Sequence, residues 1–200
     1  FVFISMLAYS AQDLILEPYA GLVFGLTPGE TTKLSGLQNA GVLSGMVLVA
    51  IAGTLSRGNR STSLRRWTIG GCIASALALF ALVTAAWFGP AWPLRGSVFA
   101  LGLANGAYAV AAIGSMMALV GAGGQGRQGV RMGLWGAAQA IAFGAGGLVG
   151  TIGADVARWT LGSPAASYAI VFAAEGVLFL VAAVLALRLE RPTPVADAAT

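Results

Sequence analysis

The residues best suited to chemistry lie near the start of the chain, where two carboxylates interrupt an otherwise apolar stretch. Tyr9, Asp13 and Glu17 follow one another at intervals of four residues, so a helix would place them on one face. At 1.5 Å per residue, Asp13 would lie about 20 Å along this helix. In a membrane, an ionised carboxylate at that depth costs at least about 2.5–3.5 kcal/mol. We therefore expect at least one of the two carboxyl groups to be protonated, paired or coordinated.

Pro18 follows Glu17 directly and adds a second unusual feature to this helix. Proline has no N–H to donate to Leu14 and clashes with its carbonyl, which predicts a kink and a freed oxygen acceptor. The neighbouring Gln12 contributes an amide. Two interpretations stay open for the carboxylates. Either they bind a ligand or a proton, or they pair with an arginine outside these 200 residues.

Composition indicates which elements carry these residues. Hydrophobic side chains make up 58% of the chain and charged ones only 9%, against about 25% charged in ordinary soluble proteins. This predicts an all-α integral membrane protein, because a helix satisfies its own backbone groups in lipid. The chain has no histidine and a single cysteine, which excludes His-dependent enzymes and an internal disulfide. With no catalytic triad, phosphate loop or metal cluster, we expect neither an enzyme nor a metal site.

Six apolar stretches are long enough to span a membrane, for which about 20 residues are needed. They cover about residues 1–25, 33–56, 67–89, 96–120, 131–154 and 165–188, and residues 189–200 are predicted to be a disordered cytoplasmic tail. Eight of the 11 Lys and Arg residues fall in the second and fourth connections and after the last span. The positive-inside rule then places both termini in the cytoplasm. Nucleic-acid binding is not expected, because these residues lie in short loops without an aromatic platform.

Further polar side chains lie inside the predicted spans. An amide in a span is typical of hydrogen bonding between helices, and together these side chains are candidates to line one polar cavity. They are Gln38, Asn39, Asn105, Tyr108 and Gln139. Glu175 is a third carboxylate within a span and interrupts the last one.

Pairs of glycines four residues apart predict close approach of helix backbones. The pairs are Gly21/Gly25, Gly41/Gly45, Gly102/Gly106, Gly129/Gly133 and Gly146/Gly150. Small residues at this spacing let helices associate in lipid, where burial of apolar surface gives little driving force.

The number of spans and one loop resemble the major facilitator superfamily. Six spans with both termini in the cytoplasm correspond to one half of a twelve-span transporter, which consists of two three-helix repeats. The loop Gly53-Thr-Leu-Ser56-Arg57-Gly-Asn-Arg60 resembles the superfamily's signature between the second and third helices of each half. Gly53, Arg57 and Arg60 match the signature, whereas Ser56 stands in place of its usual Asp.

The first span resembles the PucC/LhaA (bacteriochlorophyll delivery) branch of that superfamily. The matching segment is Gln12-Asp13-Leu-Ile-Leu-Glu17-Pro18-Tyr19-Ala-Gly21, which begins the seventh helix in this branch. The resemblance implies that the chain forms helices 7–12, and we expect an N-terminal half to precede it in a longer protein. It also implies a factor that assembles light-harvesting antenna complexes in the inner, photosynthetic membrane of bacteria. The implied partners are antenna α/β polypeptides or the reaction-centre antenna complex, the N-terminal half, and membrane lipid.

The resemblance implies transient binding of bacteriochlorophyll, and the composition constrains how the pigment could be held. Chlorin magnesium prefers oxygen or nitrogen donors, and without histidine these must be carboxylate, amide, carbonyl or water oxygens. The candidate residues are Tyr9, Gln12, Asp13, Glu17, Pro18 and Glu175. If the superfamily's order holds, the third and sixth spans lie outermost and Glu175 faces the periphery.

Two other functions remain open at this point. One is a proton-coupled transporter of a small solute, with Asp13 and Glu17 as its coupling carboxylates. The other is a structural helper subunit that binds no ligand and holds other membrane helices through its glycine-rich faces.

Overall fold

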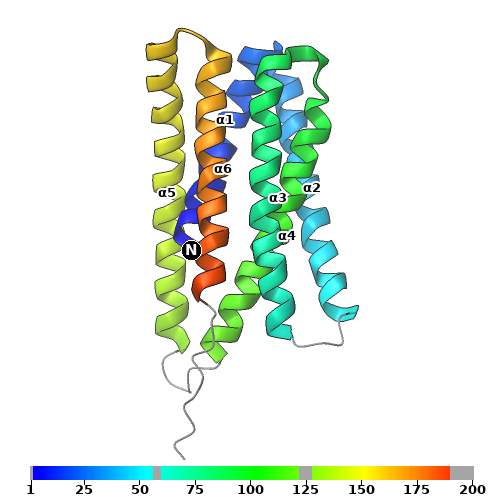
Figure 1. Cartoon of the computed structure of the whole chain (residues 1–200), viewed down its shortest axis with the longest axis vertical. Coiled ribbons are helices and arrows are strands. Elements are labelled where there is room, and N and C mark those ends of the chain that lie inside the picture. Colours follow the sequence, from blue (N-terminus) through cyan, green and yellow to red (C-terminus); the bar gives the residue numbers. More distant parts are fainter. Residues whose placement is uncertain (1, 56–59, 122–127, 190–200) are drawn as a thin grey trace, which may run out of the picture.

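The protein is a bundle of six α-helices in the ranges that its computed structural model describes, which are residues 2–55, 60–121 and 128–189. The helices run up and down side by side (Figure 1). They are α1 (Val2–Phe24), α2 (Pro28–Leu55), α3 (Arg60–Phe88), α4 (Leu94–Gly121), α5 (Gln128–Leu161) and α6 (Pro164–Leu189), with the short 3₁₀ turn η1 (Gly89–Ala91) between α3 and α4. The predicted all-α class is confirmed.

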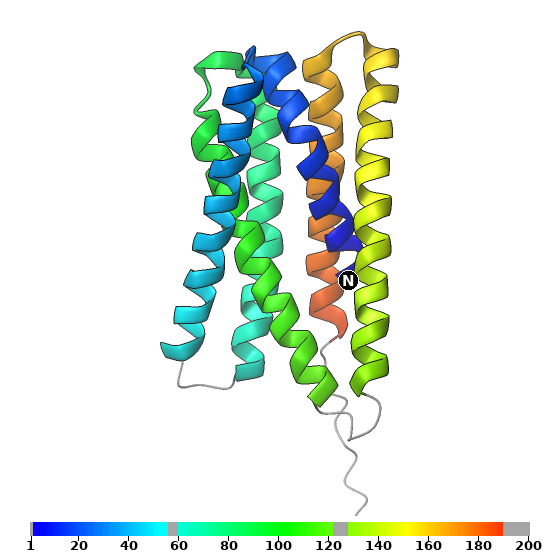
Figure 2. The same cartoon turned by 180° about the vertical axis from the view of Figure 1, so that it is seen from behind.

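Five of these helices, α2 to α6, are long and apolar enough to cross a membrane, and the chain is an integral membrane protein. The first helix, α1, has 23 residues, but Gln12, Asp13 and Glu17 make its composition more polar. Its N-terminus lies partway along the bundle rather than at an end (Figure 2). That α1 also spans the membrane stays a prediction. The last helix ends at Leu189, and the expected tail after it lies outside the described residues.

Short connections join the helices at one end of the bundle and make consecutive helices antiparallel. Gly25, Gly89 and Gly162 follow α1, α3 and α5 with φ angles of 67°, 58° and 63°, a backbone conformation that glycine adopts without strain. At the start of α2, a side-chain oxygen of Glu30 accepts hydrogen bonds from the N–H and the hydroxyl of Thr27, both at 2.9 Å. These contacts satisfy donors that a helix start leaves open.

The packing of the helices repeats after every third helix. The most extensive pairs are α2 with α4, α3 with α4, α3 with α6, α1 with α5 and α1 with α6. If each helix is replaced by the helix three places later in the chain, with α1 counted after α6, the pair α2·α4 becomes α5·α1 and the pair α3·α4 becomes α6·α1. The pair α3·α6 becomes itself. The bundle therefore consists of two equivalent units, α1–α3 and α4–α6, as expected for two three-helix repeats.

The α2·α4 crossing depends on four glycines. A Cβ atom on Gly41 would lie 2.5 Å from the carbonyl oxygen of Phe99, and one on Gly45 would overlap the carbonyl oxygen of Leu103. From the other side, Gly102 and Gly106 meet the backbone of α2 in the same way. Both pairs were predicted from their spacing, and the close backbone approach is confirmed.

The equivalent α1·α5 crossing uses a third predicted pair. Gly146 lies against the carbonyl of Leu7, and Gly150 lies against Ala11. The remaining two predicted pairs, Gly21/Gly25 and Gly129/Gly133, approach no other described helix within 4 Å. The spacing alone therefore marks candidates for a helix crossing without showing which ones meet a partner.

Aromatic side chains fill the interior between α1, α3, α4 and α6. The fully buried Tyr19 ring contacts Phe172 at 5.0 Å and Tyr168 at 5.8 Å between ring centroids. Its hydroxyl donates a 2.9 Å hydrogen bond to the carbonyl oxygen of Leu82 in α3. Further along, Tyr108 of α4 contacts Phe179 of α6 at 6.0 Å. These contacts fix which residues of α1 and α6 lie at the same height in the bundle.

Candidate functional site

Asp13 and Glu17 lie on an exposed face of α1, beside α2. Glu17 Oε1 accepts a 2.7 Å hydrogen bond from Ser35 Oγ, and Asp13 Oδ1 accepts a 3.2 Å hydrogen bond from Gln38 Nε2. The two carboxylates are one turn apart on α1, and their two donors are about one turn apart on the antiparallel α2. The four side chains form one continuous site, which we call the α1–α2 polar face.

Each carboxylate keeps one oxygen available. Asp13 Oδ2 and Glu17 Oε2 have no hydrogen bond among the described residues. No Lys or Arg of the described ranges lies within ion-pair distance of either carboxylate. Within this part of the chain, the α1–α2 polar face thus offers oxygen ligands that are held from behind by α2 and open on the other side.

The polar face is bounded by Tyr9 and Pro18. Tyr9 is half-buried, and its ring lies 5.7 Å from that of Phe143 in α5. Pro18 is exposed, and α1 continues through it as one helix. Because proline has no N–H, the carbonyl of Leu14 receives no helical hydrogen bond from it. This carbonyl is a further oxygen close to the two carboxylates.

An open apolar groove lies further along α2. It has a volume of about 670 Å³ and is lined by Leu43, Ser44, Val47, Leu48, Ile51 and Ala52. The exposed Asn39 is one helical turn before Leu43 and one residue after Gln38. One side of α2 therefore changes from polar to apolar along its length, which suits a ligand with a polar head and a hydrocarbon tail.

The structure separates the residues predicted from the sequence into two groups. Those at or beside the polar face are Tyr9, Asp13, Glu17, Pro18, Gln38 and Asn39. Those in the interior of the bundle are Gln12, Asn105, Tyr108 and Glu175, all buried. Gln139 is half-buried on α5. The described residues thus do not bring all the mid-span polar side chains together in one place.

Glu175 does not face the periphery, so that expectation is wrong. Its side chain is only 2% exposed. Phe172 and Phe179, one turn to either side, are fully buried against Tyr19 and Tyr108. Although α6 lies on one side of the bundle, it packs on α1, α3 and α5, and Glu175 is on the face that it turns inward.

The interior group is only partly hydrogen-bonded. Asn105 Oδ1 accepts a 2.8 Å hydrogen bond from Ser75 Oγ, and the hydroxyl of Tyr108 contacts that of Ser5. Among the described residues, however, Asn105 Nδ2 has no partner. The same holds for both amide atoms of Gln12 and both carboxyl oxygens of Glu175. Buried polar atoms of this kind are rare in folded proteins.

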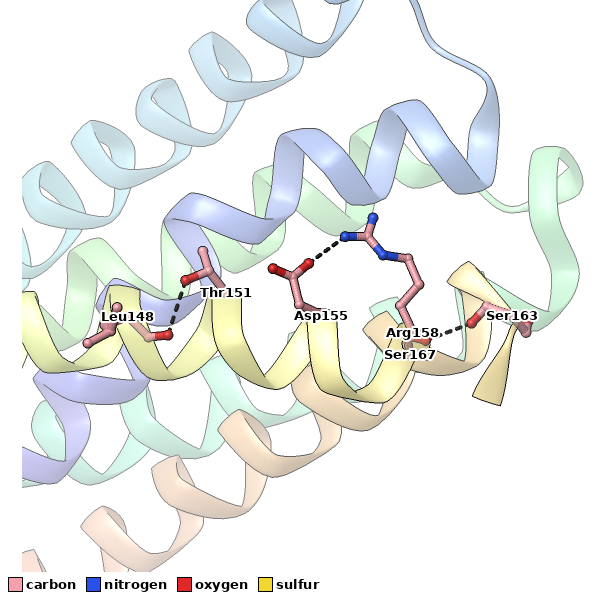
Figure 3. A network of polar contacts seen from close by, with 6 residues as sticks. All are labelled: Leu148, Thr151, Asp155, Arg158, Ser163 and Ser167. Carbon is pink, nitrogen blue, oxygen red and sulfur yellow. Dashed lines mark hydrogen bonds and ion pairs between the residues drawn. The ribbon is translucent and has the colours of Figure 1, made fainter. Parts of the chain in front are cut away.

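A separate polar network lies where α5 ends and α6 begins (Figure 3). Arg158 forms an ion pair with Asp155, and nearby hydroxyl groups bond to carbonyls of their own segment, as Ser167 Oγ does to Ser163 at 2.8 Å. Thr151 Oγ1 likewise donates to Leu148 at 3.1 Å. Since Asp155 already pairs with Arg158, this arginine is not the counter-ion of the α1 carboxylates.

The loop signature is described only in part. Gly53 lies exposed near the end of α2, and Arg60 is the first residue of α3. Arg57 lies outside the described residues. The signature-like role of this loop therefore stays a prediction.

Sequence reasoning missed Ser35, although a signal for it was present. The turn between α1 and α2 is centred on residue 26. An antiparallel helix pair that folds back at this point places residue 35 opposite Glu17, and residue 39 opposite Asp13. The actual partner of Asp13 is Gln38, one residue away. Counting outward from the turn would therefore have found Ser35 and come within one residue of Gln38.

Comparison with known proteins gives several matches over most of the chain. The model of a family described as PUCC protein matches residues 1–193. The "Bacteriochlorophyll synthase 44.5 kDa chain" of Rhodobacter capsulatus is 56% identical over 186 residues, which are 93% of this chain and 42% of that protein. "Protein PucC" of the same organism is 34% identical, over 90% of this chain and 39% of that protein. "Protein PucC" of Cereibacter sphaeroides is 32% identical, over 87% and 37%.

The chain thus spans about two fifths of the length of the curated relatives that it matches. Among solved protein structures, none matches this chain.

Proposed function

Because the chain belongs to the PucC family, we propose that it is part of an assembly factor for light-harvesting antenna complexes in photosynthetic bacteria. In this proposal, the α1–α2 polar face takes bacteriochlorophyll as a transient cargo and releases it to antenna polypeptides. The supporting observation is the pair of carboxylates, Asp13 and Glu17, each held by α2 through one oxygen and open at the other.

The chemistry of this face is compatible with a magnesium chlorin. Magnesium is a hard cation that prefers oxygen ligands, and Asp13, Glu17 and the carbonyl of Leu14 offer such oxygens. The apolar groove on α2 lies along the same helix and suits the hydrocarbon part of an amphipathic molecule. Oxygen ligands on an exposed face would bind the pigment less firmly than a buried imidazole, which favours delivery over storage.

The exposed surfaces of α2 and α5 support two further parts of the proposal. These two helices are the least buried of the five membrane-spanning candidates. We assign this surface to the N-terminal half of the longer protein, with antenna α/β polypeptides or the reaction-centre antenna complex as partners beyond it. Lipid covers the remaining surface, and the membrane is the bacterial inner membrane, with both termini of the chain on its cytoplasmic side.

The proposed role is not catalytic. One relative is named as a chain of a bacteriochlorophyll synthase. This name describes the relative and assigns no activity to the present chain. In this chain, the α1–α2 polar face offers ligands and hydrogen-bond donors, and its described residues include no general base with an oriented nucleophile. Binding and transfer of an intact pigment require neither.

A pigment-binding experiment on the full-length protein tests this proposal. The protein is purified from cells that make bacteriochlorophyll, and its absorption spectrum gives the amount of pigment per protein. The double variant Asp13→Asn/Glu17→Gln should retain at least about ten-fold less pigment, the size of effect expected when a metal's ligand sphere is weakened. Ser35→Ala should reduce binding in the same direction, because Ser35 holds Glu17.

Asp155→Asn is the matched control, since Asp155 is an exposed carboxylate of α5 that pairs with Arg158 and makes no contact with the α1–α2 polar face among the described residues. It should leave the bound pigment unchanged. Equal pigment in the wild type and the double variant, with unchanged antenna assembly in cells, would contradict the proposal. Proton-driven uptake of a solute into vesicles, without bound pigment, would favour a transporter instead. A stable complex with antenna polypeptides but no pigment would favour a structural helper.

A further inference from the structure

Four unpartnered polar atoms lie in the interior, on two helices that pack against each other. They are both side-chain amide atoms of Gln12 in α1 and both carboxyl oxygens of Glu175 in α6, and none has a hydrogen bond among the described residues. Gln12 is 0% exposed and Glu175 is 2% exposed. Neither side chain can therefore rely on bulk water, and each requires a partner inside the protein.

Helix geometry places the two side chains opposite each other. In the antiparallel pair α1·α6, the ring of Tyr19 contacts that of Tyr168 at 5.8 Å. Seven residues, or about two helical turns, return a helix to nearly the same face. Seven residues back from Tyr19 is Gln12, and seven residues on from Tyr168 is Glu175. Asp13, next to Gln12, is also close enough to Glu175 for their charges to interact.

We propose that Gln12 and Glu175 form an acid–amide pair that holds one proton inside the bundle and joins α1 to α6. A protonated carboxyl group has one O–H donor and one free acceptor oxygen, and a primary amide has the complementary acceptor and N–H donor. In the structure the two side chains do not make these bonds with each other. In the proposed pair, rotation of the side chains lets the carboxyl O–H of Glu175 donate to Gln12 Oε1 and Gln12 Nε2 donate to the other oxygen of Glu175. Two hydrogen bonds thus satisfy all four atoms at once.

The ionised form of Glu175 has no comparable arrangement. A carboxylate only accepts hydrogen bonds, so it would leave Gln12 Oε1 without a donor and bring two acceptors together. The titratable groups on the helices that pack around α6 do not change this. Asp13 on α1 interacts with Glu175 as a like charge. Tyr19 on α1 and Tyr108 on α4 contact Phe172 and Phe179 of α6, and Cys72 on α3 lies near Tyr108. Asp155 and Arg158 of α5 lie near Tyr168. None of these supplies a cation to Glu175.

The pair has a consequence for the two repeats. In the equivalent helix pair α4·α3, Asn105 is hydrogen-bonded to Ser75. In both helix pairs, therefore, the amide lies on the first helix of one repeat, α1 or α4. Its polar partner lies on the third helix of the other repeat, α6 or α3. Only the α1·α6 pair includes a carboxyl group, so only this contact depends on a bound proton.

Infrared spectroscopy of the full-length protein at neutral pH tests the proposal directly. A protonated carboxyl group gives a C=O stretching band that a carboxylate lacks. The wild type should show this band, Glu175→Gln should lose it, and Gln12→Leu should shift it because the hydrogen-bond partner is gone. Asp155→Asn is the matched control, since Asp155 is an exposed carboxylate that pairs with Arg158, and it should leave the band unchanged.

Glu175→Gln also tests the pair by stability. An amide in this position can make two hydrogen bonds to Gln12 without a bound proton, so the variant should fold. Raising the pH should destabilise the wild type, which loses the proton of Glu175, and should not destabilise the variant in this way. Failure of this variant to fold would overturn the proposal, because the ionised carboxylate would then be required. A band that persists in Glu175→Gln, or that does not shift in Gln12→Leu, would overturn it as well.

Discussion

Tyr19 contributes to the bundle in two ways, and their sizes differ. Its ring is fully buried between Phe172, Tyr168 and Phe24, and its hydroxyl bonds to Leu82 at 2.9 Å. Hydrogen bonds between helices in a membrane average only about 0.6 kcal/mol. Replacing a large buried ring with alanine costs about 3–5 kcal/mol in soluble proteins. Packing, rather than the hydroxyl, should therefore dominate at this position.

We expect Tyr19→Phe to lower the free energy of unfolding by about 0.6 kcal/mol and Tyr19→Ala to lower it by several-fold more. The measurement is unfolding of the full-length protein in mixed micelles with increasing denaturing detergent. Tyr9→Phe is a suitable control, since the hydroxyl of Tyr9 has no hydrogen bond among the described residues. A larger loss for Tyr19→Phe than for Tyr19→Ala would show that the hydroxyl matters more than the ring.

At the scale of the helices, small residues decide which elements lie next to each other. The α2·α4 crossing brings backbone against backbone at Gly41, Gly45, Gly102 and Gly106. The equivalent α1·α5 crossing uses Gly146 and Gly150, and Ser10 Oγ adds a 2.6 Å hydrogen bond to the carbonyl of Phe143. Because α1 is held against α5 and α6, the opposite side of α1 is left to carry Asp13 and Glu17.

We expect Gly45→Ala to destabilise the bundle by about 1–3 kcal/mol, the usual cost of overpacking. The added methyl group would overlap the carbonyl of Leu103, and backbone cannot move aside as a flexible side chain can. Gly36→Ala on the same helix is the control, since nothing lies within 4 Å of its Cβ position. It should stabilise α2 by up to about 1 kcal/mol. Equal effects of the two variants on unfolding would contradict the close crossing.

At the scale of the whole molecule, the sequence was sufficient to predict those features that depend on one helix at a time. The apolar stretches predicted an all-α membrane protein, and the spacing of Asp13 and Glu17 predicted their common face. The reasoning failed for Glu175, because the orientation of one residue on a helix depends on which neighbours cover each side. The separation of Asn105 and Tyr108 from Gln38 also required the packing of α3 and α4, which no local pattern encodes.

The two ends of the bundle differ in charge, and this difference predicts how the protein is oriented in the membrane. The orientation can be tested on a single helix. The C-termini of α2, α4 and α6 and the N-termini of α3 and α5 lie at the same end of the bundle (Figure 1). Arg65, Arg131 and Arg188 belong to this end, where Arg65 also donates to the carbonyl of Leu187 at 3.0 Å. The positive-inside rule predicts that this end is cytoplasmic.

Thiol labelling at the two ends of α5 tests this orientation. With 34 residues, α5 is about 51 Å long, whereas the hydrocarbon core of a bilayer is about 30 Å thick, so both its ends project from that core. In intact cells whose outer membrane admits the reagent, an impermeant thiol reagent should label Thr160→Cys but not Gly129→Cys. After the inner membrane is opened, both should react. The protein without an introduced cysteine is the control, because Cys72, the one cysteine of these 200 residues, is fully buried and should not react. Labelling of Gly129→Cys alone in intact cells would reverse the orientation, and with it the side of the membrane on which the C-terminus lies.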